Sequence, residues 1–274
     1  MKCSTIAAIV LVIFANNATI AAPDAERIVS LDFCADQYVL KMLPRSRILA
    51  VSPNAGKHFS YMRDSTTNIP TVRPIAEDVL ALKPDLIIRS YGGGPYASRF
   101  FELAGVSVLQ VPLTNSLEDI RNAIRHVADG LGVTQQGEKI ISTMNRRLES
   151  IHKSNSKRMA LYMTPTGVTS GPGTLIHEML QAADLENFQR QPGWRSIPLE
   201  RLAYEQPAVI AAAFFTAEEN YLSMWSPMRH PVAKNQMIDQ PTVMLQGAWT
   251  ACAGWYLLDA IEALANSATI DGNQ

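Results

Sequence analysis

The sequence predicts an α/β protein of two α/β lobes with mainly parallel central sheets, joined by a single long α-helix, with a ligand cleft between the lobes. Short apolar runs alternate with helical runs along most of the chain, which is typical of parallel α/β units. The stretch AEDVLALKPDLII (76–88) is followed by the similar LERLAYEQPAVIA (199–211), with Glu77 and Glu200 separated by 123 residues. This repeat distance is about the size of one lobe.

The composition limits the classes of partner. The chain has 274 residues, of which 47% are hydrophobic, and a formal net charge of −1. Such a chain can bury one large or two medium cores. The charge balance does not favour binding to phosphate backbones, so we expect no nucleic-acid partner.

The first 22 residues are typical of a secretory signal peptide. Lys2 is followed by an unbroken apolar run and then by small residues, which predicts cleavage near Ala21 or Ala22. Cys3 precedes the apolar run, so we expect no lipid anchor, and no later stretch approaches the roughly 20 apolar residues of a membrane span. We therefore expect a protein exported to the periplasm.

The N-terminal lobe is predicted over residues 23–133, with strands and helices in alternation. Its expected strands are 27–31, 47–52, 85–90 and 106–111, and its expected helices are 36–43, 76–83, 96–105 and 117–131. Lys83 precedes Pro84 and must therefore end its helix. Ser116, with Asp119 three residues later, has the spacing of a capping box at the start of the last of these helices.

The connecting helix is predicted within residues 134–156, running from Thr134 to about Lys153. Its apolar residues fall on one face, and about 20 helical residues would reach roughly 30 Å, enough to cross between two lobes. The C-terminal lobe, 157–274, begins after the polar segment 152–157. Its expected strands are 158–163 and 208–215, and its expected helices are 174–184, 199–206 and 254–266.

Loops that follow the strands are predicted to line the cleft, because open parallel sheets bind ligands at the carboxyl ends of their strands. These loops are rich in aromatic side chains, which suit a bulky and partly apolar ligand, and arginines among them suit an anionic one. Each aromatic residue could instead belong to the core. The candidate ligand-binding residues are Phe33, His58, Tyr61, Arg73, Tyr91, Tyr96, Trp194, Arg195, Trp225 and Trp249.

Catalytic and metal-binding patterns are incomplete. The serine of GVTSG (167–171) is one position late for a nucleophile elbow, and GGG (92–94) lacks the rest of a phosphate-binding loop, so both are interpreted as turns. No spaced set of metal ligands stands out, and we expect neither an enzyme nor a cofactor of the protein's own. A secreted α/β hydrolase using Ser170 is the alternative of another class.

Two cysteines, Cys34 and Cys252, remain after signal cleavage. Each precedes a predicted helix, one in either lobe. An oxidising compartment favours pairing, but two cysteines whose Cα atoms lie more than about 7 Å apart cannot join. The sequence leaves a disulfide and two separate thiols open.

The motifs RIVSLDFCADQYVLKML, AEDVLALKPDLII, ELAGVSVLQV and GPGTLIHEMLQAADLENF resemble, in this order, the periplasmic binding proteins of importers for iron complexes and vitamin B12. The resemblance extends from about Arg27 to Ala265. It implies a monomer with small hinge movement that captures a metal chelate and delivers it to an inner-membrane ABC permease with its ATPase. We expect a ferric siderophore as cargo, with cobalamin or haem as alternatives.

The same resemblance implies a role for the repeated glutamates. In this family an acidic residue on each lobe docks into a basic pocket of the permease, and the matching positions here are Glu77 and Glu200. The alternative is structural, because a carboxylate in the first turn of a helix favours the helix dipole by roughly 0.3–1 kcal/mol.

Overall fold

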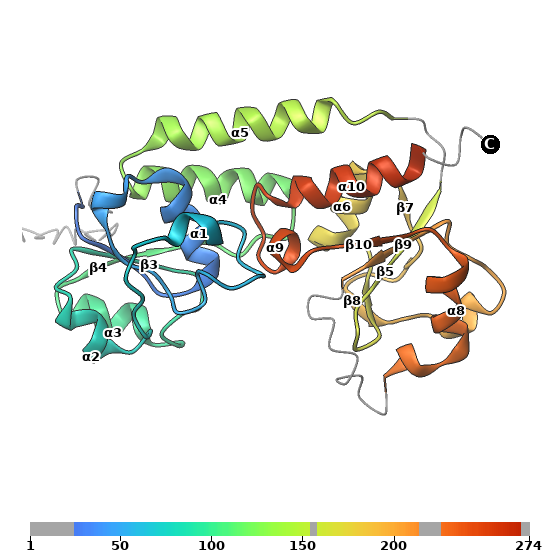
Figure 1. The fold of residues 1–274 in the computed structure, drawn as a ribbon, viewed down its shortest axis with the longest axis horizontal. Coiled ribbons are helices and arrows are strands. Elements are labelled where there is room, and N and C mark those ends of the chain that lie inside the picture. Colours follow the sequence, from blue (N-terminus) through green and yellow to red (C-terminus); the bar gives the residue numbers. More distant parts are fainter. Residues whose placement is uncertain (1–24, 154–157, 214–225, 270–274) are drawn as a thin grey trace, which may run out of the picture.

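The computed structural model describes residues 25–153, 158–213 and 226–269, and it has two α/β lobes (Figure 1). The N-terminal lobe comprises the elements from β1 to α4, and the C-terminal lobe those from β5 to α10. Helix α5 (Thr134–Glu149) runs along one side of the molecule from the first lobe toward the second. This arrangement confirms the predicted fold class.

A four-stranded sheet forms the centre of the N-terminal lobe. All its pairs are parallel, and its strand order is β2-β1-β3-β4. The strands are β1 (Ile28–Ser30), β2 (Ile48–Ala50), β3 (Leu86–Arg89) and β4 (Ser107–Gln110). The helices are α1 (Phe33–Met42), α2 (Ala76–Ala81), α3 (Ala97–Leu103) and α4 (Leu117–Gly130), with short 3₁₀ turns at Arg45–Arg47 and Arg63–Thr66.

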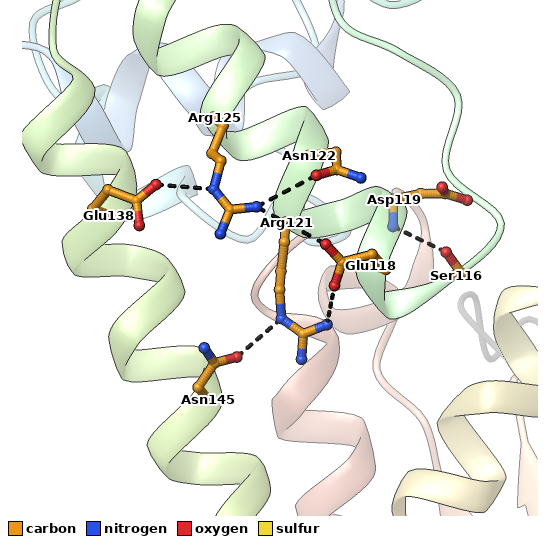
Figure 2. A network of polar contacts seen from close by, with 8 residues as sticks. All are labelled: Ser116, Glu118, Asp119, Arg121, Asn122, Arg125, Glu138 and Asn145. Atoms are coloured by element: carbon orange, nitrogen blue, oxygen red, sulfur yellow. Dashed lines mark hydrogen bonds and ion pairs between the residues drawn. The ribbon is translucent and has the colours of Figure 1, made fainter.

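Local sequence signals set the ends of these helices. The hydroxyl of Ser116 accepts a hydrogen bond from the backbone N–H of Asp119 at 2.9 Å, so the predicted cap of α4 is confirmed (Figure 2). Helix α2 ends at Ala81, and Lys83 before the proline has a φ of 51°, outside the right-handed helical region. The start of α4 and the end of α2 therefore both depend on residues close to them in the sequence.

The C-terminal lobe repeats the plan of the first. Its parallel sheet has the order β10-β9-β5-β7, built from β5 (Met159–Met163), β7 (Glu186–Asn187), β9 (Val209–Ala212) and β10 (Thr242–Met244). Counted along each lobe, both sheets have the spatial order second, first, third, fourth. The helices are α6 (Leu175–Ala182), α7 (Leu199–Leu202), α8 (Pro231–Asp239), α9 (Gly247–Thr250) and α10 (Leu257–Thr269), with a 3₁₀ turn at Pro227–Arg229.

Several predicted boundaries in this half were wrong. Residues 164–174 and 191–195 were expected to be loops, but part of each forms the antiparallel pair β6 (Val168–Ser170) and β8 (Trp194–Ser196). The helix expected over 199–206 has only four residues, and α8, α9 and β10 were not predicted. These elements are short and lie among Gly and Pro residues, where periodicity gives little signal. Part of the strand expected over 208–215 lies outside the described residues.

Helix α5 has 16 residues and ends at Glu149, earlier than Lys153, so it spans about 24 Å. It packs on α4, where Arg121 donates to Asn145 and Arg125 pairs with Glu138, both at 2.9 Å (Figure 2). At its other end, Arg147 pairs with carboxylates of α10 in the C-terminal lobe. The helix therefore contacts both lobes through named side chains.

Each sheet is covered on both faces. One large apolar core joins residues of both sheets with α1, α4, α5, α6 and α10, and it runs without interruption through the two lobes. A second core in the N-terminal lobe lies under α2 and α3, and its counterpart in the C-terminal lobe lies under α7 and α8. Burial on both faces explains why the central strands read as continuous apolar runs.

Candidate ligand site at the carboxyl ends of the strands

An aromatic cluster stands at the carboxyl ends of the N-terminal strands. The ring of Phe33 meets Phe59 edge-on at 4.9 Å between centroids and Tyr91 at 6.1 Å, and His58 contacts Phe59 at 5.2 Å. We call these four residues the N-lobe aromatic cluster. Phe33 begins the helix after β1, while Tyr91 follows β3 and the other two follow β2. Tyr91 is 53% exposed, so the cluster presents one accessible ring to solvent.

Asp32 connects the start of α1, which carries Phe33, with the loop that carries Tyr91. One carboxylate oxygen of this buried residue accepts hydrogen bonds from the backbone N–H groups of Ser90, Tyr91 and Gly92 at 2.7, 3.0 and 2.9 Å. The other oxygen caps α1 by accepting from the N–H of Ala35. A Cβ at Gly92 would stand 2.5 Å from the carbonyl oxygen of Leu31, so only glycine allows this approach. The start of α1 and the Tyr91 loop are therefore held together.

The glycine-rich loop is a turn, as predicted. Buried Arg89 donates to the carbonyl oxygens of Gly92 and Gly94 at 2.8 and 2.9 Å, and also to the hydroxyl of Ser98. The guanidinium is therefore bound by the loop's own backbone and by Ser98 of α3. It fixes the loop that carries Tyr91.

A second buried acid, Asp36, secures the loop that carries His58 and Phe59. Its carboxylate accepts from the backbone N–H of Ser52 at 3.1 Å and from the Ser52 hydroxyl at 2.6 Å. Burial outweighs these bonds and raises the pKa of Asp36 to about 7. Burial, with Asp32 and Asp36 nearby, also raises the pKa of Tyr91 to about 12, so its phenol stays protonated at neutral pH.

In the C-terminal lobe, Trp194 lies on β8, which Figure 1 shows on the side of this lobe nearer the first. It is 58% exposed, and its ring meets Tyr162 edge-on at 6.1 Å. Successive side chains of a strand face opposite sides, so Arg195 lies on the face opposite to Trp194, where it donates to the carbonyl oxygen of Pro192. Trp249 on α9 is half-buried and packs on the large core, and Trp225 lies outside the described residues.

Three predicted ligand residues lie away from the N-lobe aromatic cluster. Tyr61 stacks on Tyr256 at 4.9 Å and lines a cavity of about 360 Å³ beside α5. Arg73 forms a two-bond ion pair with Asp78, at 2.6 and 3.2 Å. Tyr96 lies in a groove with Glu77, between α2 and α3. The structure does not bring these three residues together with the cluster, because the direction of each side chain depends on neighbours distant from the strand ends.

A disulfide joins Cys34 on α1 to Cys252 after α9, with a Cα–Cα distance of 5.6 Å. Of the two alternatives that the sequence left open, the structure therefore has the disulfide. The residues after Cys252 also pack on the N-terminal lobe, where Trp255 meets Tyr38 edge-on at 5.5 Å. This segment of the C-terminal lobe is fastened to the first lobe beside Phe33.

The two repeated glutamates occupy equivalent places. Each is the second residue of a short helix, and each lies nine residues before the third strand of its sheet, β3 or β9. Both side chains are exposed, and neither Glu77 nor Glu200 has a side-chain hydrogen bond or ion pair with another described residue. Neither serves as the helix cap through its own side chain.

Sequence reasoning missed Asp32, Phe59 and Tyr162. Asp32 was missed because the helix was predicted to begin at residue 36, whereas α1 begins at Phe33 and makes Asp32 its N-cap. Phe59 was adjacent to His58 in the same predicted loop, whereas Tyr162 lay within a predicted strand and gave no sign of contact with Trp194. Its position next to His58 could therefore have identified Phe59, but no sequence signal pointed to Tyr162.

Other kinds of site find little support in the described part of the chain. No group of three or more His, Cys, Asp or Glu residues there could hold a metal ion. Ser170 is fully buried, and its hydroxyl is hydrogen-bonded to that of Thr174 at 2.7 Å, so the proposed nucleophile is not accessible. Among the described helices, none is long and apolar enough to cross a membrane.

Two relatives are similar in sequence. An ABC transporter substrate-binding lipoprotein of Bacillus subtilis, YvrC, is 24% identical over 147 residues, covering 49% of this chain and 47% of the relative. The chain therefore aligns with about half the length of that relative. The vitamin B12-binding protein of Pectobacterium atrosepticum is 24% identical over 202 residues, covering 69% of each chain.

Solved structures share the fold, and a family profile identifies the group. A periplasmic heme-binding protein from Pseudomonas aeruginosa superposes with a TM-score of 0.63 at 21% identity, covering 91% of this chain and 94% of that chain. At this identity the likeness shows the shared fold. The profile described as "Periplasmic binding protein" matches residues 44–242, which are 199 of the 274 residues. With two equivalent α/β lobes and one helix joining them, the chain belongs to the periplasmic binding protein family.

Proposed function

We propose that this protein is the substrate-binding component of an ABC importer for a bulky metal chelate. The observation that carries the proposal is the placement of aromatic rings near the carboxyl ends of parallel strands in both lobes. Phe33 and Tyr91 follow β1 and β3, and in the other lobe Trp194, the first residue of the antiparallel strand β8, contacts Tyr162 near the carboxyl end of β5. Ligands of open parallel sheets bind at these ends. The relatives that bind vitamin B12 or heme support the same class of cargo.

The chemistry of the site favours a flat macrocycle, a corrinoid or haem, over a highly anionic siderophore. Arg73 is neutralised by Asp78, and Arg195 faces away from Trp194, so the arginines expected to bind an anion lie apart from the aromatic rings. Ring faces bind planar ligands by stacking. The phenol of Tyr91 adds a neutral hydrogen-bond donor, because its raised pKa keeps the proton in place. A ferric siderophore is the remaining candidate.

Glu77 and Glu200 are proposed to dock the loaded protein on the two membrane subunits of the importer. Their support is the equivalent position in two lobes of the same topology, exposed and without a partner among the described residues. Charged contacts of this kind steer association and fix orientation. The protein would meet these subunits in the periplasm after loss of residues 1–22, whose structure is not described.

Titration of the mature protein with cobalamin, haemin and a panel of ferric siderophores, followed by tryptophan fluorescence, tests the proposal. We expect one cargo class to quench the signal, and Tyr91→Ala to weaken its binding about tenfold or more, because a stacked ring is lost. Tyr91→Phe should retain the ring contact. Tyr204→Ala is the matched control, since this exposed tyrosine follows α7.

Two results would contradict the proposal. The first is the absence of binding by any chelate of the panel. The second is equal affinity of wild type and Tyr91→Ala for the bound cargo, which would remove the ring from the site. Ester hydrolysis lost on Ser170→Ala would instead revive the hydrolase alternative.

A further inference from the structure

A groove of about 380 Å³ lies between the N-terminal ends of α2 and α3, on the side of the N-terminal lobe away from α5 (Figure 1). Its walls are mostly apolar, and three of its large side chains are exposed to solvent: Ile75, Tyr96 (80%) and Phe100 (48%). Adjacent exposed rings of this kind mark an interaction surface more often than a solvated one. The volume is ample for one large apolar side chain of a partner.

Glu77 stands on the wall of this groove and supplies its charge. The adjacent carboxylate, Asp78, is neutralised by the two-bond pair with Arg73. Glu77 has no such partner among the described residues, so the groove combines apolar walls with one uncompensated negative charge. A partner that fits must offer an apolar side chain next to a cation.

The equivalent groove in the C-terminal lobe has different chemistry. It measures about 500 Å³ and includes Glu200, but also the charged residues Arg190 and Arg201. Arg201 pairs with Glu205 at 2.9 Å, stacks over the Phe188 ring at 3.9 Å and donates to the Phe188 carbonyl oxygen. Arg190 also lies 3.8 Å from Glu205, so the two arginines balance the charges of Glu200 and Glu205. The two grooves match in backbone position but not in charge.

We propose that the groove between α2 and α3 receives one apolar side chain of the importer's membrane subunit, while Glu77 pairs with a neighbouring basic residue. The N-terminal lobe is then the stronger of the two docking points, and the Glu200 contact adds steering and orientation. This inference rests on the proposed function. Docking would bury the rings of Phe100 and Tyr96. Their contribution to the binding free energy would persist at high salt, unlike that of an exposed ion pair.

Photo-crosslinking first identifies the partner in the native host. The photoreactive residue p-benzoylphenylalanine replaces Phe100, or Leu103 as the control, because Leu103 lies on the same helix and is 79% exposed but does not line the groove. We expect position 100 to crosslink to a membrane subunit of an ABC importer, identified by mass spectrometry, and position 103 not to do so. A crosslink from both positions, or from neither, would overturn the inference.

Binding to that importer in lipid nanodiscs is then measured at 50 and 500 mM salt. Phe100→Ser and Tyr96→Ser should weaken docking about tenfold at both concentrations. Glu77→Gln should cost more than Glu200→Gln, and both losses should shrink at high salt. Leu103→Ser should bind as wild type does.

The outcomes separate the two claims. If both glutamine variants dock poorly while Phe100→Ser and Tyr96→Ser dock normally, the groove inference fails and the proposed function stands. If wild type does not dock at all, both fail. If the wild type binds equally well to nanodiscs with and without the importer, the groove between α2 and α3 contacts lipid, and the inference is overturned. The cargo titration should be unchanged in every variant.

Discussion

Asp32 and Asp36 lie one helical turn apart at the start of α1, yet their surroundings differ. Asp32 accepts four backbone N–H groups, which replace its water of hydration. Asp36 is buried with Ser30 and Ser52 as hydrogen-bond partners and has Asp32 as a neighbouring negative charge. Its pKa therefore rises, because burial disfavours the charged form more than these partners favour it.

This pKa predicts a specific pH dependence of stability. In the unfolded chain Asp36 has its ordinary pKa of 3.8, and in the folded protein the pKa is about 7, so the folded state binds the proton more tightly. The stabilising contribution is complete below pH 3.8 and is lost as the pH rises to about 7. The loss amounts to about 4 kcal/mol, at about 1.4 kcal/mol for each unit of pKa difference.

Asp36→Asn, which stays neutral at every pH, should remove this dependence. Urea unfolding at pH 4.5, 6 and 8 should show wild type losing stability relative to Asp36→Asn as the pH rises. Asp64→Asn changes an exposed aspartate and serves as the control. Parallel pH curves for wild type and Asp36→Asn would contradict the assignment of a raised pKa.

Among the elements, α5 depends on one arginine for its contact with the C-terminal lobe. Arg147 bonds Glu262 and Asp259 on α10, each at 2.7 Å, and lowers the pKa of Glu262. Tyr61 of the N-terminal lobe lies beside the same Asp259, and burial together with this carboxylate raises the pKa of Tyr61. One cluster thus connects the helix with both lobes.

Arg147→Met should lower the free energy of unfolding by about 1 kcal/mol at pH 7, the range of a well-formed but partly solvated pair. Glu262 has a depressed pKa, so the stability it contributes is present above its ordinary pKa of 4.5 and lost as the pH falls below it. The difference between wild type and variant in urea unfolding should therefore shrink at pH 3. Arg146→Met, at an exposed position on the same helix, should behave as wild type; an equal loss in both would contradict the role of the cluster.

At the scale of the whole molecule, three features restrict movement of the lobes. The large core is continuous through both lobes, α5 contacts each of them, and the Cys34–Cys252 disulfide joins them beside the proposed site. Lobes joined by a small polar interface are expected to move freely, whereas a shared apolar core opposes it. We therefore expect a small hinge movement on ligand binding.

Reduction of the disulfide should lower the free energy of unfolding of the mature protein by about 2–5 kcal/mol, because a crosslink between residues 218 positions apart strongly restricts the unfolded chain. The measurement is urea unfolding with and without dithiothreitol. The Cys34→Ser/Cys252→Ser variant is the control and should not respond to the reductant. Two titratable thiols in the unreduced protein would show that the bridge is absent in solution.

The sequence by itself determined the two-lobe class, the repeat and many helix ends. These features depend on short-range or periodic patterns, which the sequence alone contains. They are the alternating apolar runs, the repeated stretches around Glu77 and Glu200, and the Ser116 cap. The sequence also placed Phe33 and Tyr91 directly after strands, whereas Trp194, expected in a loop, begins strand β8. The sequence did not identify their aromatic neighbours Phe59 and Tyr162, or the role of Asp32.

Only the tertiary structure decided which side chains meet. Asp32 bonds a loop about 60 residues away, Tyr61 stacks on Tyr256, and Arg195 lies on the opposite face of its strand from Trp194. The direction of a loop side chain depends on contacts that form when distant segments pack, and no local pattern encodes them. The same reason explains why two stretches so alike in sequence, around Glu77 and Glu200, carry grooves of different charge.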